Sequence, residues 1–344
     1  MTSNITQAIH SLRSRNLHRQ PDHPLCIIKQ KVYDYFGESY SKFDNLDAVV
    51  STRANFDDLL IPEDHPCRKR SDTYYIDDQT ILRTQTSAHQ TEVLRNGYDK
   101  FLVTGDVYRK DEVDRTHYPV FHQMEGVCLN TDLDDLVNTM RGLMDTLFPE
   151  CKCRMNKDYF PFTDPSLEIE VEYNGEWLEV AGCGIIQPQI LNNAGRNEKL
   201  GGWAFGLGLE RLAMILFKIP DIRLFWSQDP KFTSQFRAGC ITPFKPFSSL
   251  DPLPRDISFF VTDDYEVNEF YDICRDIAGD CLERVERFDK FFHPKKKAMS
   301  HAYRLTYSPP DSSLSDPGAF THMANDIHSQ IYKVVREKLN VIIR

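Results

Sequence analysis

The sequence predicts an α+β fold in which an antiparallel sheet flanked by helices is followed by a smaller C-terminal domain with the order β-α-β-β-α-β. Three observations lead to this prediction. Residues 101–129 contain a strand-like run, a charged loop and a second strand-like run. An Asn-Gly pair at residues 174–175 separates two alternating runs, which is the strongest short-range signal of a β-hairpin. Downstream of residue 255, β-rich runs and helical stretches follow one another in the stated order.

The individual elements follow from the spacing of apolar residues. Helical spacing predicts helices over 23–36 and 132–148. Extended runs predict strands over 73–76, 101–109, 120–129, 167–173 and 177–180. Residues 202–214 predict a strand, a Gly-rich turn and a helix. The C-terminal elements are strands over 256–261, 282–292, 300–307 and 341–343, with helices over 266–278 and 316–339.

Prolines mark the predicted boundary between the domains. Five of them fall within residues 228–254, so this stretch is expected to be a linker, and its phenylalanines indicate that it lies on a surface. The predicted domains are residues 1–227, which include a short N-terminal segment, and residues 255–344. Residues 1–21 contain three arginines and no acidic residue. This suits either a mitochondrial transit peptide or a surface helix of the mature protein, and we expect the helix.

Composition excludes several classes of protein. The net charge of −10 argues against a protein coated in positive charge, although a local basic patch could still bind nucleic acid. No apolar run approaches the length of a membrane span, so no membrane association is expected. The nine cysteines form no CxxC pair, which favours reduced thiols over a disulfide framework or a zinc site.

Residues 101–129 predict a binding site. Alternation along the second strand places one set of side chains on a single face: Phe121, Gln123, Glu125 and Val127. Burying the Gln and the Glu unpaired is costly, and a ligand ammonium would satisfy both. Arg109 ends the first strand, where its guanidinium can bind a phosphate or carboxylate with two hydrogen bonds. The stretch therefore predicts a site for an amino acid beside a nucleotide phosphate, unless the polar residues of the hairpin simply pair with each other.

Other candidate residues fall in two further segments. Phe160 and Phe162 are two residues apart, so an extended backbone points both rings to one side, although most such pairs lie in a core. Gly206 and Gly208 leave room for a ligand close to the backbone, and Arg211 at the following helix start can reach a phosphate.

Three strings resemble the signatures of class II aminoacyl-tRNA synthetases. The string YRKDEVDRTHYPVFHQMEG resembles the second signature, NFDDLLIPEDHPCR is similar to the first, and GLGLERLAM resembles the third. In detail they look like phenylalanyl-tRNA synthetases of the single-chain mitochondrial type, and the resemblance runs from about residue 16 to the last strand. The family's fold is an antiparallel class II sheet followed by a ferredoxin-like anticodon-binding domain.

The resemblance implies a two-step reaction in which phenylalanine and ATP give phenylalanyl-adenylate, and the acyl group then passes to tRNA(Phe). By resemblance, the residues that bind the phenylalanine ammonium are Ser87, Gln123 and Glu125. Those around its ring are Phe160, Phe162 and Ala204. Those that contact ATP are Arg109, His117, Gly206, Gly208 and Arg211, with Arg109 and Arg211 acting on the phosphates. Magnesium needs a carboxylate near the phosphates, and Glu179 is the candidate ligand for Mg²⁺. Gln85 departs from the His that relatives often have there.

The C-terminal domain contains a basic hairpin tip. Lys295, Lys296, Lys297 and Arg304 occur with no acidic residue between Asp289 and Asp311. A solvated loop would explain such a charge run, but the resemblance favours contacts with tRNA phosphates. We expect a monomeric enzyme of the mitochondrial matrix without an editing domain. The alternatives are the catalytic chain of a two-subunit synthetase and a non-catalytic RNA-binding relative.

Overall fold

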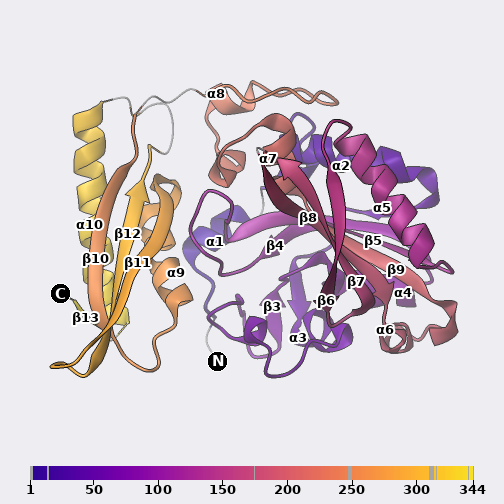
Figure 1. The fold of residues 1–344 in the computed structure, drawn as a ribbon, viewed down its shortest axis with the longest axis horizontal. Helices are drawn as coiled ribbons and strands as arrows, with labels where there is room; N and C mark the ends of the chain where they lie inside the picture. Colours follow the sequence, from indigo (N-terminus) through magenta and orange to yellow (C-terminus); the bar gives the residue numbers. More distant parts are fainter. Residues whose placement is uncertain are drawn as a thin grey trace.

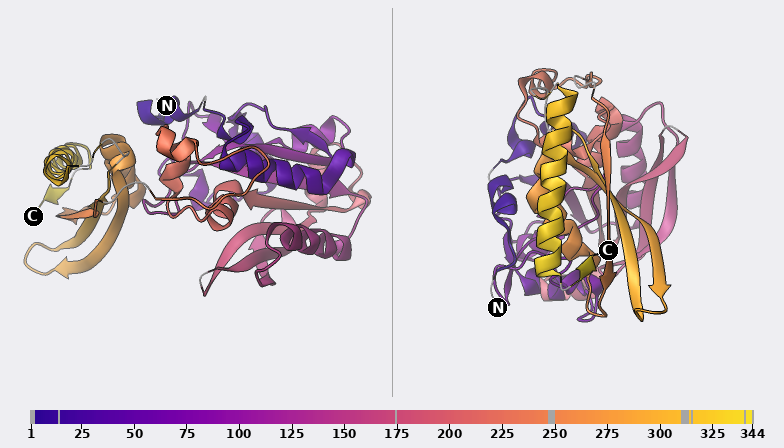
Figure 2. Two further views of the ribbon diagram at one scale, coloured as in Figure 1. Left: turned by 90° about the horizontal axis from the view of Figure 1, so that it is seen from above. Right: turned by 90° about the vertical axis from the view of Figure 1, so that its left-hand side faces the viewer.

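Two domains lie side by side in the computed structural model, which describes residues 3–13, 15–173, 175–246, 250–309, 314, 316–339 and 341–343. Figure 1 shows the larger N-terminal domain on the right and the C-terminal domain on the left, and Figure 2 shows the same pair from two further sides. The described residues contain a seven-stranded sheet in the first domain, a four-stranded sheet in the second and a separate two-stranded ribbon. The observed fold is therefore α+β, as predicted.

The seven-stranded sheet is antiparallel except for one edge pair. Its order is β1-β4-β5-β9-β8-β7-β6, and only β1 and β4 run parallel. The strands are β1 (Ser41–Phe43), β4 (Lys100–Tyr108), β5 (Val120–Leu129), β6 (Cys153–Phe160), β7 (Thr163–Tyr173), β8 (Glu176–Ile186) and β9 (Gly202–Gly208). Asn174 lies outside the described residues, but Tyr173 pairs with Glu176, so the predicted hairpin is confirmed.

Alternation along the strands divides this sheet into two faces. On one face, Leu102, Met124 and Phe205 pack with the helices α2 (Pro24–Phe36), α5 (Leu133–Leu147) and α7 (Leu209–Phe217) in one apolar core. On the other face, Phe101 and Val127 pack with residues of smaller elements, among them η3 (Asp57–Leu59), α4 (Gln90–Arg95) and α6 (Pro188–Asn193). Three long helices thus cover one face, and the lighter cover of the second face leaves room for a cavity.

Local signals set the helix starts. The predicted helices at 23–36 and 132–148 are confirmed, because His23 and Asp132 cap α2 and α5 by accepting from the backbone N–H of Leu25 and Asp135. The predicted surface helix near the N-terminus is present as α1 (Gln7–Leu12), with Ile9 buried in the core.

The predicted strand at residues 73–76 is wrong. Within it, only Tyr75 forms an isolated bridge, to Ile81. The ribbon forms instead from β2 (Val49–Ser51) and β3 (Thr80–Leu82). Tyr74 O and Ile76 N do bond to β3, but Thr73 N donates to Lys69 O and Asp77 N to Thr80 O, so turns on both sides limit the pairing to this one bridge. The side chain of Asn4 accepts from Tyr75 N at 2.6 Å and donates to the carbonyl of Thr73 at 3.1 Å.

The C-terminal domain has the predicted order of elements. They are β10 (Leu253–Val261), α9 (Val267–Ala278), β11 (Leu282–His293), β12 (Ala298–Tyr307), α10 (Pro317–Lys338) and β13 (Ile342–Ile343). The sheet order β11-β12-β10-β13 is that of a ferredoxin-like split βαβ unit. Figure 1 shows α9 on the side that faces the N-terminal domain.

The connection between the domains lies against the first of them, as predicted. It begins with α8 (Pro230–Thr233), and Phe232, Phe236 and Phe244 are buried in the core beside α7. All nine cysteines are free thiols. Among the described residues, no helix has the length and apolarity that crossing a membrane requires.

Candidate active site

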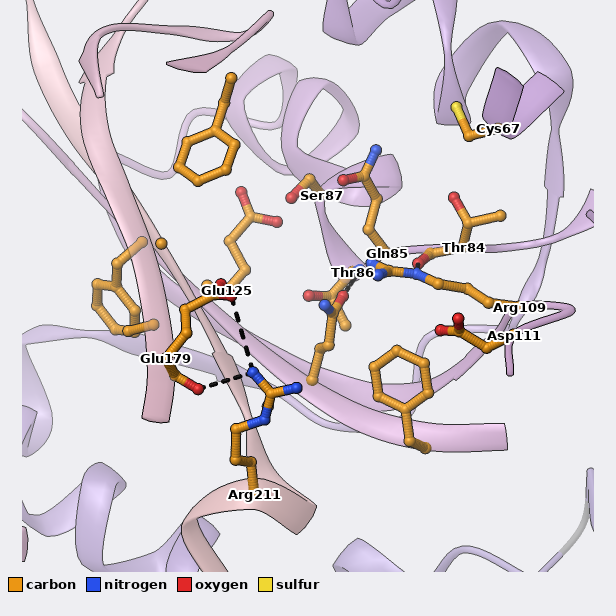
Figure 3. A pocket seen from close by; sticks show the side chains of 18 of the residues that line it. Cys67, Thr84, Gln85, Thr86, Ser87, Arg109, Asp111, Glu125, Glu179 and Arg211 are labelled. Carbon is orange, nitrogen blue, oxygen red and sulfur yellow. Dashed lines mark hydrogen bonds and ion pairs between the residues drawn. The ribbon is translucent and has the colours of Figure 1, made fainter. Parts of the chain in front are cut away.

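A single cavity of about 620 Å³ lies over the second face of the seven-stranded sheet. It collects twelve residues that the sequence singles out from five separate segments of the chain. They are Ser87, Arg109, His117, Gln123, Glu125, Phe160, Phe162, Glu179, Ala204, Gly206, Gly208 and Arg211. Figure 3 shows several of these side chains pointing into the cavity from different strands.

The floor of the cavity follows from the register of three antiparallel strands. Gln123 and Glu125 pair with Gly208 and Gly206, and Gly206 pairs in turn with Gly182. Residues opposite each other in a ladder project to the same side of the sheet. A Cβ added at Gly206 or Gly208 would meet no atom within 4 Å. The glycines therefore leave an open trough beside the two polar side chains.

Glu125 has a buried carboxylate that the protein satisfies only in part. The residue is 2% exposed, and its Oε2 has no hydrogen-bond partner among the described residues. Burial raises the pKa of Glu125 to about 8, and a hydrogen bond from Ser87 opposes this only in part. Figure 3 shows the Ser87 and Glu125 side chains pointing toward each other. A ligand cation at this point would pair with the free oxygen and favour the ionised form.

Two phenylalanine rings form an apolar end of the same cavity. The centroids of Phe160 and Phe162 lie 5.9 Å apart with 10° between the ring planes. A Cβ at Gly182 would lie 2.8 Å from the Phe160 ring, so glycine is needed for the ring to approach β8 this closely. With the small side chain of Ala204 beside them, the two rings offer a slot for a flat apolar group.

Arg109 lies where β4 ends, and its neighbours fix the guanidinium in the cavity wall. Its Nε donates to the carbonyl of Thr84 at 2.8 Å, and its Cζ lies 5.2 Å from the centre of the Phe121 ring. Burial lowers the pKa of Arg109, but arginine remains protonated in proteins. The wall therefore contains a fixed positive charge suited to phosphate or carboxylate oxygens.

Arg211 and Glu179 lie together at the mouth of the cavity. Arg211 Nη1 donates to the carbonyl of Glu179 at 2.8 Å and lies 3.8 Å from its carboxylate (Figure 3). Both side chains are exposed, so water or a ligand can reach them. Mg²⁺ in nucleotide sites binds one or two carboxylates and takes its remaining ligands from phosphates and water. The Glu179 carboxylate fits that requirement.

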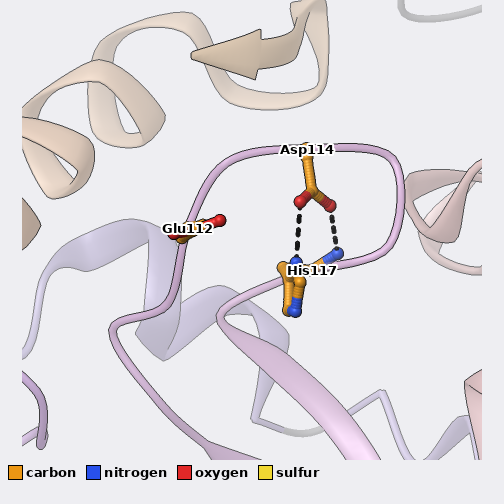
Figure 4. A group of neighbouring side chains, drawn as sticks. All are labelled: Glu112, Asp114 and His117. Atoms are coloured by element: carbon orange, nitrogen blue, oxygen red, sulfur yellow. Dashed lines mark hydrogen bonds and ion pairs between the residues drawn. The ribbon is translucent and has the colours of Figure 1, made fainter. Parts of the chain in front are cut away.

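A second group of metal-ligand residues lies in the loop between β4 and β5. The ligand atoms of Glu112, Asp114 and His117 all lie within 4.8 Å of one another. Asp114 Oδ2 is 2.8 Å from His117 Nδ1, and Asp114 Oδ1 accepts from the backbone N–H of Thr116 and His117 (Figure 4). The bond to Asp114 raises the pKa of His117. These contacts explain the group as a brace that holds the His117 imidazole in the cavity wall and favours its protonated form.

Cavity residues without a role in the sequence-based prediction include Thr86, Asp111 and Phe121. Thr86 N donates to Gln123 Oε1 at 3.3 Å and so orients the Gln123 amide. Phe121 could have been found, because it shares the predicted face of β5. Asp111 had no signal, because contacts far away in the sequence determine the path of its loop.

The basic tip predicted in the C-terminal domain is present, but Arg304 is not part of it. Lys295, Lys296 and Lys297 are exposed in the β11–β12 turn. Arg304 lies well inside β12, where its guanidinium makes two hydrogen bonds of 2.8 Å to Asp256 and lies 5.1 Å from the Phe288 ring. Six residues of strand, about 20 Å, separate it from the turn. Lying in the same acid-free stretch of sequence therefore does not place Arg304 beside the three lysines.

Family models match both domains. Residues 9–236 match the class II core domain (F) of tRNA synthetases, and residues 248–344 match the ferredoxin-fold anticodon binding domain. Together with the antiparallel sheet and the cavity, these matches show that the chain belongs to the class II aminoacyl-tRNA synthetases.

Curated relatives identify the branch of that class. The chain is 46% identical to the chloroplastic/mitochondrial phenylalanine–tRNA ligase of Arabidopsis thaliana, over 100% of this chain and 83% of the relative. It is 41% identical to the mitochondrial phenylalanine–tRNA ligase of Mus musculus, over 98% and 85%. A phenylalanine–tRNA ligase alpha subunit of Prochlorococcus marinus is 41% identical over only 62% of this chain and 65% of its own. The chain belongs to the family of mitochondrial phenylalanine–tRNA ligases.

Proposed function

We propose that this chain attaches phenylalanine to tRNA(Phe) in two steps at the cavity described above. The phenylalanine carboxylate attacks the α-phosphorus of ATP, the bond to the β-phosphate bridge breaks, and pyrophosphate leaves. The hydroxyl of the 3′-terminal adenosine of tRNA then attacks the acyl carbon, loses its proton and displaces AMP. The observation that carries the proposal is the unsatisfied Glu125 oxygen between an aromatic slot and a fixed arginine.

The aromatic end of the cavity suits phenylalanine in particular. The ammonium would bind Glu125, with Ser87 and Gln123 beside it, while the phenyl ring enters the slot of Phe160, Phe162 and Ala204. The ring would meet apolar side chains, so a tyrosine hydroxyl would find neither room nor a hydrogen-bond partner there. Such a pocket discriminates against an added hydroxyl only moderately, by about a hundredfold.

The opposite end suits a nucleotide. Arg109 would bind the α-phosphate and the substrate carboxylate, and Arg211 the terminal phosphate. His117 would add a further cation, Gly206 and Gly208 would leave space for the nucleotide, and the Phe121 ring offers a stacking surface for adenine. Bound at Glu179, Mg²⁺ would neutralise charge on the phosphates. The protein's own contribution is positioning and charge stabilisation.

The location, tRNA contacts and oligomeric state that we propose for the enzyme follow from its family. The mitochondrial names of the relatives support a mitochondrial location, and we propose the matrix. The Lys295–Lys297 turn is proposed to contact tRNA phosphates, because the domain that carries it matches an anticodon-binding family. We also propose that the chain acts as a monomer, since relatives that extend over the whole chain, rather than the alpha subunit, are the better match.

The test is ATP–pyrophosphate exchange by the purified chain with Mg²⁺ and each amino acid in turn. Exchange that depends on phenylalanine would establish the activation step and its substrate, without any partner chain. The absence of exchange with every amino acid, from a sample whose circular dichroism shows it to be folded, would contradict the proposal.

A further inference from the structure

The loop that joins β4 to β5 contributes several residues to the nucleotide end of the cavity but has little structure of its own. We call residues 109–119 the nucleotide loop. Arg109, Asp111, Thr116 and His117 on it line the cavity, yet none of residues 109–119 is in a helix or strand. Its internal hydrogen bonds fix the turn around Asp114 and join its two ends, where Arg109 N donates to the carbonyl of Pro119. The N-terminal domain bonds the first two loop residues, through the carbonyls of Thr84 and Asp72. The path of residues 111–113 depends on further contacts.

The C-terminal domain supplies contacts to residues 111–113, and three of them are hydrogen bonds to loop carbonyls. Arg275 on α9 donates through Nη1 to the carbonyl of Asp111 and also to that of Glu112, at 3.4 Å. Val285 N on β11 donates to the carbonyl of Val113 at 2.7 Å. β11 is an edge strand of its sheet, so this bond attaches the loop to that edge. Bonds to main-chain carbonyls constrain the course of the loop itself.

Side chains of the loop are buried in the same interface. Val113 is 5% exposed and belongs to the apolar core of the C-terminal domain. Arg115 donates to Glu283, with nitrogen–oxygen distances of 2.8 and 2.6 Å, and Glu283 is itself 6% exposed. Lys110 Nζ lies 2.5 Å from Asp272 Oδ2 and is also buried. The Lys110–Asp272 pair is buried, so removing one of its partners is costly, whereas the Arg115 side chain is 55% exposed and its ion pair holds the loop less firmly.

The amino-acid end of the cavity is held differently. Glu125 is hydrogen-bonded by Ser87, Gln123 by Thr86, and Phe160 stacks on Phe162, all within the N-terminal domain. A change at the domain interface should therefore reach the nucleotide end first.

We propose that Arg275, together with Val285 and Glu283, positions the nucleotide loop for ATP, so that the C-terminal domain is part of the ATP site. The inference rests on the proposed function, because it assigns the cavity to ATP. Arg275 is a positioning residue and does not touch the reacting atoms. Its removal should weaken ATP binding and leave phenylalanine binding unchanged.

The experiment compares full-length variants by pyrophosphate exchange and by hydrogen exchange. Arg275→Met removes the bonds to the loop and keeps most of the side-chain volume. We expect the KM for ATP to rise about tenfold or more, as loss of a charged hydrogen bond implies, and the KM for phenylalanine to stay within about twofold. Arg275→Lys, which retains a donor, should restore part of the loss. The Val285 amide, bonded to Val113 in the native protein, should exchange faster in Arg275→Met.

The matched control is Glu266→Gln. Glu266 joins the same two domains through an exposed contact of 3.1 Å to Lys69, away from the loop. It should leave both KM values within about twofold, as expected of an exposed pair. If Arg275→Met melts too low to assay, Val113→Ala gives the same comparison.

Two results would overturn the inference: equal changes in both KM values, or an unchanged KM for ATP with unchanged protection of Val285. Loss of phenylalanine-dependent exchange in the unaltered chain would instead contradict the proposed function, and the protection of Val285 would still report whether Arg275 orders the loop.

Discussion

The two ends of the cavity are built by different means. The end proposed for phenylalanine consists of strands in fixed register, where Glu125 lies opposite Gly206 and Val127 opposite Ala204. The end proposed for ATP consists of exposed arginine and glutamate side chains, together with a loop that a second domain holds. One end is set by hydrogen bonds within a single domain, and the other also depends on contacts across a domain interface.

The two ends of the cavity correspond to two tasks, selecting the amino acid and binding ATP for the reaction. Selecting one amino acid requires a rigid pocket, and packed strands provide one. Binding a polyphosphate requires several cations placed around a large ligand, and a braced loop with exposed arginines provides that. Variants should therefore divide into those that change which amino acid reacts and those that change how well ATP reacts.

The largest expected effect is at Arg109, where the two ends meet. Arg109→Ala should lower kcat/KM for pyrophosphate exchange by about 10³-fold, because it removes a fixed charge proposed to act on the α-phosphate and the carboxylate. Arg109→Lys is the matched control, since it keeps the positive charge and loses the paired N–H donors of the guanidinium. It should recover only part of the activity. Exchange rates within about threefold of the unaltered chain for Arg109→Ala would contradict the assignment.

At the phenylalanine end of the cavity, Glu125 should make the affinity for the amino acid depend on pH. Its pKa of about 8 means that the ligand-free carboxyl is largely protonated at pH 6 and must ionise to bind an ammonium. The affinity for phenylalanine should therefore rise between pH 6 and pH 8, by at most about tenfold per pH unit. Glu125→Gln should bind about 10²-fold more weakly, as loss of a buried charge pair implies, with a flat profile. Calorimetry in two buffers of different ionisation enthalpy would detect the proton released.

The same carboxyl should affect folding stability with a definite sign. A raised pKa means that burial disfavours the charged form, so the folded protein loses stability as pH rises from the unfolded value near 4.5 toward about 8. Glu125→Gln should have a higher melting temperature than the unaltered chain at pH 8, and the gap should close toward pH 5. A gap of the same size at both pH values would show that Glu125 is already ionised in the free protein.

Ala204 tests the aromatic slot alone. Ala204→Gly should enlarge the slot and raise exchange with para-chlorophenylalanine, relative to phenylalanine, by about tenfold, in line with the effect of a methyl group in an apolar pocket. Ala194→Gly, a buried change at the end of α6, controls for the effect of glycine on stability. Unchanged selectivity in Ala204→Gly would remove Ala204 from the site.

The smallest effect is expected at the lysine turn. Replacing Lys295, Lys296 and Lys297 with alanine should raise the KM for tRNA severalfold. The slope of log KM against log salt concentration should fall by the equivalent of up to about three phosphate contacts. Arg304→Ala is the control, because its guanidinium is already bonded to Asp256, and it should change the KM for tRNA much less. Equal effects of the two changes would restore Arg304 to the tRNA-binding surface.

Much of the phenylalanine end could be predicted from local sequence. Alternation alone placed Gln123 and Glu125 on one face of β5. Both predicted rings, Phe160 and Phe162, line the cavity, but β6 ends at Phe160 and a turn, not the expected extended backbone, brings Phe162 beside it. The register that sets Glu125 opposite Gly206 joins segments some eighty residues apart, and no local pattern encodes it.

The failures have two physical causes. The strand expected at 73–76 is limited to a single bridge by the turns at Lys69 and Thr80. Val113 belonged to a loop expected to be charged but is buried in the core of the other domain. Arg304 was grouped with the lysine tip but is paired with Asp256 on the neighbouring strand. In these last two cases a partner distant in the sequence outweighs the local preference.

The most direct test of the central claim is charging of a complete tRNA mixture. The purified chain would be incubated with ATP, Mg²⁺, all twenty amino acids and total mitochondrial tRNA, and the aminoacyl-adenosine released by nuclease would be identified by mass spectrometry. We predict phenylalanyl-adenosine and no other aminoacyl-adenosine. An ester of another amino acid, or none from a chain that folds and binds ATP, would contradict the account.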